Sequence, residues 1–80
     1  MASETLHLPP KSDPRWHDLV LGRNPNPPKL LALKFLLTRV SLAAKKDSSP
    51  TAIQKGVDEL YEFFQKNPRI VEADAAAYFH

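Results

Sequence analysis

The 80-residue sequence contains no cysteine and only two glycines, and it has three widely separated histidines. Without cysteine, the chain has neither a disulfide framework nor a thiolate zinc site. The spacing of His7, His17 and His80 matches no metal-binding motif, and neither glycine belongs to a phosphate-binding loop. We therefore find no candidate catalytic, cofactor-binding or metal-binding residue, and we expect a protein that is not an enzyme and that needs no cofactor.

The sequence also lacks alternating apolar and polar segments, which are typical of half-buried strands. Its first residues do not combine a basic segment with an apolar core, so they do not form a secretory signal, and we expect a cytoplasmic protein. The only long apolar stretch contains Lys34 and Arg39, each of which costs about 2.5 to 3.5 kcal/mol at the centre of a bilayer. No transmembrane span is therefore expected.

Eight prolines divide this chain into segments. A side chain able to cap a helix is followed by proline at Asp13-Pro14, Asn26-Pro27, Ser49-Pro50 and Asn67-Pro68. Proline is well tolerated at the first helical position, because its missing N–H would have no partner there. The pattern predicts an all-α fold, a single small helical bundle over residues 13–80 with three main helices and a short N-terminal one. Its helices are expected over about 14–21, 28–46, 50–66 and 68–79, after a flexible arm over residues 1–12, and Gly22 is expected to end the first helix in a left-handed cap.

The segment 29–46 is the most apolar part of the chain. From residue 30 to residue 44, all side chains are apolar except Lys34, Thr38, Arg39 and Ser41. At about 100° per residue, most of its polar residues fall within a strip about 60° wide, and apolar residues occupy almost all of the remaining circumference. We expect this helix to be covered on most sides by the rest of the chain or by another molecule.

One apolar ridge of this helix lies beside the polar strip and consists of Leu31, Phe35 and Leu42. It can be closed either by Trp16 from the short first helix or by another molecule. The candidate interaction surface is therefore Trp16, Leu31, Phe35 and Leu42. The function favoured by this pattern is a non-enzymatic protein-interaction module that binds a protein partner or forms a homodimer.

The third and fourth segments differ in clarity. Apolar residues recur every three or four positions in the third segment, at Ile53, Val57, Leu60 and Phe64, which is the pattern of an amphipathic helix. Gly56 lies beside this stripe, where a close approach of another helix would explain the lack of a side chain. In the fourth segment, Asp74 interrupts an alanine-rich run, so the sequence does not define a buried face there.

Basic residues are concentrated in the second segment and the loop before it. No acid occurs between Asp18 and Asp47, whereas this interval contains Arg23, Lys29, Lys34, Arg39, Lys45 and Lys46. One interpretation is ion pairing between the basic second helix and the mildly acidic third helix. The other is a basic surface for nucleic acid, which makes a small DNA- or RNA-binding helical protein the alternative function. The modest net charge of +2 favours the first interpretation.

Overall fold

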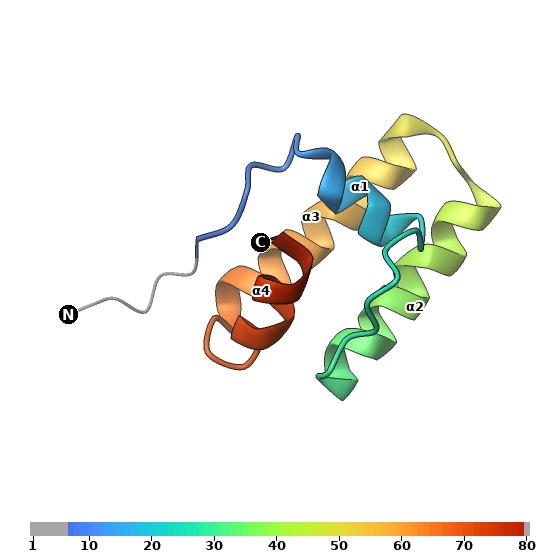
Figure 1. The fold of residues 1–80 in the computed structure, drawn as a ribbon. Coiled ribbons are helices and arrows are strands. Elements are labelled where there is room, and N and C mark those ends of the chain that lie inside the picture. Colours follow the sequence, from blue (N-terminus) through green and yellow to red (C-terminus); the bar gives the residue numbers. More distant parts are fainter. Residues whose placement is uncertain (1–6, 80) are drawn as a thin grey trace.

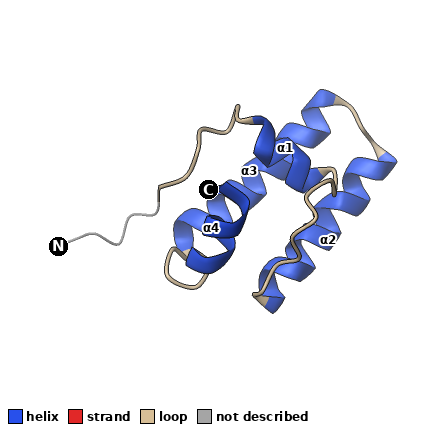
Figure 2. Ribbon diagram, viewed as in Figure 1, coloured by secondary structure: helices blue, strands red, loops and turns tan. Residues whose placement is uncertain are grey.

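Four helices follow one another in the computed structural model, in the order of the proline-marked segments (Figure 1). The structure describes residues 7–79. Helix α1 spans Pro14–Val20, α2 spans Leu31–Lys46, α3 spans Pro50–Lys66 and α4 spans Glu72–Phe79. Loops and turns connect them, and this described part of the chain contains no strand (Figure 2). The prediction of an all-α fold with a short first helix is confirmed.

Two of the predicted caps begin helices as expected. The Asp13 carboxylate accepts the backbone N–H of Arg15 at 2.9 Å, at the start of α1. The Ser49 hydroxyl accepts the backbone N–H of Ala52 at 3.3 Å, at the start of α3. In both helices a proline occupies the first turn, where its missing N–H leaves no donor unpaired.

Helix α1 ends at the predicted glycine. Gly22 has a φ of 72°, in the left-handed region that residues with a Cβ rarely adopt. Its N–H donates to the carbonyl of Leu19 at 3.2 Å, and the N–H of Arg23 donates to the carbonyl of Asp18 at 2.8 Å. This pair of bonds is the Schellman motif, and it turns the chain sharply into the proline-rich loop.

Helix α4 begins at Glu72 and not at Pro68, so it is short. Asn67 does not cap it, because this residue ends α3 instead: its backbone N–H and its side-chain amide donate to the carbonyl of Phe63 at 3.1 and 2.9 Å. Residues 68–71 form turns before the helix starts. The bundle therefore consists of two long helices and two short ones, where three main helices were expected.

Helix α2 begins at Leu31, three residues later than predicted. The two backbone N–H groups just before it, of Lys29 and Leu30, donate to the carboxylate of Asp74 at 2.8 and 3.1 Å. Leu30 is the N-cap residue and α2 has no side-chain cap, but Asp74 of α4 holds the two backbone N–H groups that lead into the helix. Asp74 is only 2% exposed, and the residue that interrupted the sequence pattern is thus a buried structural group.

The core lies where α1 packs against both α2 and α3. Its buried apolar residues are Trp16, Leu19, Val20, Leu33, Val40, Ala44, Val57, Leu60, Phe64, Val71, Ala75 and Tyr78. Gly56 of α3 lies at the closest approach, since a Cβ there would meet Val20 of α1 at 3.1 Å and Val40 of α2 at 3.6 Å. The expectation that a neighbouring helix explains this glycine is confirmed.

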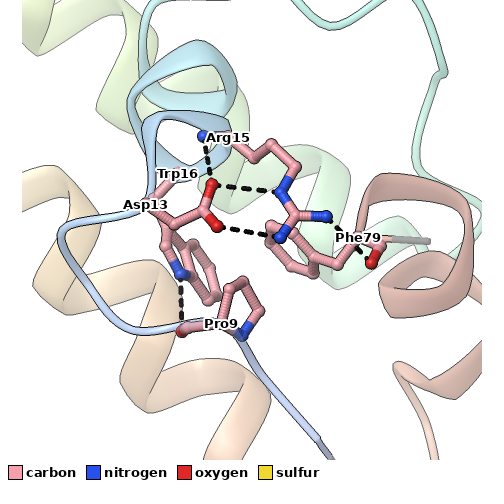
Figure 3. Close-up of polar contacts among 5 residues, drawn as sticks. All are labelled: Pro9, Asp13, Arg15, Trp16 and Phe79. Carbon is pink, nitrogen blue, oxygen red and sulfur yellow. Dashed lines mark hydrogen bonds and ion pairs between the residues drawn. The ribbon is translucent and has the colours of Figure 1, made fainter.

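Part of the flexible arm predicted over residues 1–12 contacts the helices through Leu8, Pro9 and Lys11. Leu8 packs against the core, and the carbonyl of Pro9 accepts the Trp16 indole N–H at 3.0 Å (Figure 3). Lys11 pairs with Asp58 at 3.3 Å. Residues 1–6 of the predicted arm lie outside the described residues.

Arg15 connects the first helix to the last. Its guanidinium binds both carboxylate oxygens of Asp13, at 3.0 and 2.8 Å, and donates to the carbonyl of Phe79 at 3.0 Å (Figure 3). The side-chain hydrogen bond from Arg15 and, after it, the backbone hydrogen bond lower the pKa of Asp13 from 3.8 to about 2. The carboxylate that caps α1 therefore stays ionised at a lower pH than an ordinary Asp side chain.

This arrangement predicts a pH-dependent contribution of Asp13 to stability. Because the folded state lowers the pKa, the carboxylate stabilises the fold at pH values above its unfolded pKa of about 3.9. That contribution is lost as the pH falls towards about 2. Urea unfolding of the wild type and of Asp13→Asn should differ most above pH 5, and the difference should shrink between pH 4 and pH 2. A difference that does not change with pH would contradict this.

Candidate interaction surface on the second helix

The predicted ridge of α2 is exposed. Leu31, Phe35 and Leu42 have 61%, 64% and 55% of their surface open to solvent. Trp16 is 0% exposed, so its assignment to the interaction surface is wrong. Its indole packs against Tyr61, Phe64 and Phe79, with ring centroids 5.5, 5.5 and 4.5 Å away, and these rings of α3 and α4 enclose it. Trp16 therefore does not close the ridge.

The ridge stays open because α2 buries only one side. Leu33, Val40 and Ala44 are its buried residues, and on a helical wheel they lie about 160° to 180° away from the centre of the ridge. Helices α1 and α3 pack on that buried side, while α4 lies beside α3 and α1 (Figure 1). Within residues 7–79 the chain therefore covers one side of α2, and the expectation that another molecule covers the ridge stays a prediction.

The exposed residues of α2 follow the spacing of a helix-pairing seam. Leu31, Phe35, Thr38, Leu42 and Lys45 are separated by four, three, four and three positions. This spacing keeps side chains in one line facing a partner helix. Here the α2 seam denotes these five residues. From Leu31 to Leu42 it extends about 16 Å along the helix, at about 1.5 Å per residue.

The predicted basic surface is divided by the fold. Lys34, Arg39 and Lys46 are exposed along the two sides of the α2 seam, and Lys45 lies at its end. Arg23 and Lys29 are exposed in the loop between α1 and α2, and so lie off the helix. The six cations therefore form no single continuous helix face.

Ion pairing between α2 and α3 is confirmed at one position. Arg39 binds Glu59 at 2.8 Å, and the Arg39 side chain is still 65% exposed. The acids on either side of Glu59 along α3 have other partners: Asp58 pairs with Lys11 and Glu62 with Lys66. No ion pair of Lys34 or Lys46 is formed within residues 7–79, and these two cations accompany the seam without an acid.

A groove of about 460 Å³ borders the α2 seam, between α2 and the loop that follows α1. The apolar part of its lining comes from Leu19, Leu37, Leu42, Pro25, Pro27 and Pro28, and its cationic part from Lys34 and Lys45. The Ser41 hydroxyl donates to the carbonyl of Val20 at 3.0 Å, and the Thr38 hydroxyl donates to the carbonyl of Lys34 at 2.9 Å. The groove thus combines an apolar surface with two ammonium groups, which suits an apolar side chain next to an anion.

Within residues 7–79, no three His, Cys, Asp or Glu side chains gather in a way that could hold a metal ion. Burial and, secondarily, the charge of Asp74 raise the pKa of Tyr78 to about 12, so this phenol stays protonated. None of the described helices has both the length and the apolarity needed to cross a bilayer.

Sequence reasoning missed two elements of this region. The loop wall of the groove was not foreseen, because the proline-rich segment contains only breakers and no periodicity that would place it against α2. The role of Asp74 was the second. The sequence shows an acid within an alanine-rich helix, and the two backbone N–H groups before α2 need an acceptor, so these two features are complementary. Recognising that complementarity would require knowing that the two segments meet.

Comparisons of the chain with protein-family models, with curated proteins and with solved structures found no match. A function is therefore inferred from the surface of this chain itself.

Proposed function

We propose that this protein is a non-enzymatic interaction module that binds another protein through the α2 seam. The observation that carries the proposal is the alignment of three large apolar side chains, each more than half exposed, along three turns of one helix. Single exposed apolar residues are ordinary on protein surfaces, but several that are aligned on one helix face support a contact site. The row also has the spacing with which one helix docks on another.

The occupant of the α2 seam can in principle be a different protein or a second copy of this chain. Both would cover the same three apolar residues, and burying a side chain of this size contributes about 1.5 to 3 kcal/mol. Nucleic acid is the alternative ligand, supported by Lys34, Arg39 and Lys46. It is the weaker candidate, because these cations alternate with apolar side chains that would then lie against a phosphate backbone.

The variant Phe35→Glu tests this function. It places a charge in the centre of the α2 seam, so the amount of captured partner should decrease by at least about tenfold. Thermal stability should change little, because Phe35 is exposed. The measurement is affinity capture from the native host after nuclease treatment, with mass determination of the complexes and a thermal melt of each bait.

Ile70→Glu is the matched control, since Ile70 is 59% exposed but lies in the turn before α4. It should capture the same partner as the wild type. If Phe35→Glu captures that partner as well as Ile70→Glu does, the α2 seam is not the binding site. Capture that disappears on nuclease treatment would favour the nucleic-acid alternative.

A further inference from the structure

We propose that the α2 seam binds an acidic amphipathic helix, with apolar residues facing the seam and carboxylates along both sides. This inference rests on the interaction function proposed above and specifies the chemistry of its partner. It follows from the placement of charge relative to the exposed apolar residues.

The heptad register of α2 places cations on both sides of the α2 seam. With Phe35 and Leu42 at a positions, Leu31 and Thr38 fall at d positions. Lys34 then occupies a g position, and Arg39 and Lys46 occupy e positions. In paired helices the e and g residues contact the flanks of the partner and determine which partner is accepted. A partner with Glu or Asp at its own e and g positions would meet a cation on each side.

A second copy of this chain is a poor occupant of the same surface. In a parallel pair of helices, Lys34 of one copy would approach Arg39 of the other copy. In an antiparallel pair, Arg39 and Lys46 of one copy would face Arg39 and Lys46 of the other copy. No acid of α2 can relieve this repulsion, because none occurs between Asp18 and Asp47. Glu59 offsets the charge of Arg39 in its own chain, which leaves Lys34 and Lys46 as the cations whose repulsion is not relieved within residues 7–79. The charges therefore favour an acidic partner over self-association.

The groove beside the α2 seam also favours a partner helix with acidic side chains. Leu42 belongs to both the seam and the groove, and Lys34 and Lys45 line the groove as well. A helix lying along the seam can place one further apolar residue in this space of about 460 Å³, with a neighbouring carboxylate beside the two ammonium groups. The prolines of the loop restrict the backbone of the opposite wall, which keeps the groove formed before binding.

The exposed apolar row is also too narrow for a membrane surface to be the better occupant. Leu31, Phe35 and Leu42 fall within about 40° of the helix circumference. A helix that lies in a bilayer interface normally has a broad apolar face opposite its cationic one. Here the apolar row lies between cations, and this arrangement fits a single partner helix better than a membrane surface.

The test uses the whole chain and three labelled synthetic helices, each about three heptads long. All three have Leu at the a and d positions, and they differ only at e and g, where they carry Glu, Gln or Lys. Fluorescence anisotropy at moderate salt should rank binding as Glu, then Gln, then Lys, with at least about tenfold between the first and the last. Equal binding of the Glu and Lys peptides would overturn the inference.

Charge reversal on the protein provides a second readout. The double variant Lys34→Glu, Lys46→Glu should exchange the preference, so that the Lys peptide binds more tightly than the Glu peptide. Lys55→Glu changes charge at an exposed position of α3 that lies off the seam, and it should keep the wild-type ranking. An unchanged ranking in the double variant would contradict the assigned role of the two lysines.

The outcomes separate this inference from the proposed function. If the three peptides bind equally and Phe35→Glu abolishes binding, the seam is an interaction site and the acidic partner is wrong. If no peptide binds but the wild type sediments as a dimer that Phe35→Glu dissociates, the occupant is a second copy. Binding only to vesicles of anionic lipid, with none to the peptides, would assign the seam to a membrane surface and overturn the inference.

Discussion

Replacing Trp16 with alanine is expected to destabilise the protein by about 3 to 5 kcal/mol, which is a large part of the total stability of a domain this small. Trp16 is fully buried and touches three aromatic rings of α3 and α4. Its removal leaves a cavity at the point where α1, α3 and α4 meet, and Pro9 loses the hydrogen bond to the indole. We expect thermal and urea unfolding to show either a much lower midpoint or a chain that is already unfolded.

The matched control is Phe35→Ala, which also removes a large aromatic side chain from a helix. Phe35 is 64% exposed, so this variant should change the free energy of unfolding by no more than about 0.5 kcal/mol. Similar losses for the two variants would contradict the placement of Trp16 inside the core and of Phe35 on the surface. A partial truncation, Trp16→Phe, keeps the measurement possible if Trp16→Ala does not fold.

Removing the carboxylate of Asp74 is the second change with a large expected effect. Asp74→Ala should cost at least about 3 kcal/mol, because a hydrogen bond to a charged group contributes about 1.5 to 3 kcal/mol and Asp74 accepts two. The N–H groups of Lys29 and Leu30 would lose their acceptor just before α2 begins. Amide hydrogen exchange should therefore accelerate at these two residues, and urea unfolding should show the loss of stability.

Glu72→Ala is the control for this prediction, because Glu72 is an exposed acid in the same first turn of α4. It removes an equal charge from that turn without removing the acceptor of the Lys29 and Leu30 N–H groups, so its effect should stay within about 0.5 kcal/mol. If Glu72→Ala and Asp74→Ala destabilise the chain equally, the effect belongs to the charge at the start of α4. In that case the hydrogen bonds of Asp74 to Lys29 and Leu30 do not hold the start of α2.

The local features of this fold could be predicted from the sequence. A cap followed by proline identified the starts of α1 and α3, and Gly22 identified the end of α1. These signals are local, since the side chain and the backbone groups that it satisfies lie within a few residues of each other. The spacing of apolar residues in α3 and the position of Gly56 were equally informative, because a helix determines which residues share a face.

The long-range features could not be predicted in the same way. The partners of Asp74 lie 45 and 44 residues away in the sequence, so no window around residue 74 contains them. Trp16 was assigned to the ridge of α2, because the pattern of a two-turn helix does not say which neighbour its large residue meets. The apolarity of α2 predicted that most of its sides are covered, whereas within residues 7–79 α1 and α3 pack on one side and leave its ridge as a candidate binding surface.

The contact between the first and last helices has a consequence for synthesis on the ribosome. Arg15 donates to the carbonyl of Phe79, 64 residues later, and the rings of Trp16 and Phe79 lie 4.5 Å apart. A growing chain that has produced α1, α2 and α3 still lacks the ring and the carbonyl that complete the environment of α1. Helix α1 can already pack against α2 and α3 at that stage, but Arg15 and Trp16 complete their contacts only after residue 79 has been added. The nascent chain therefore gains its full stability only after its last helix has been translated.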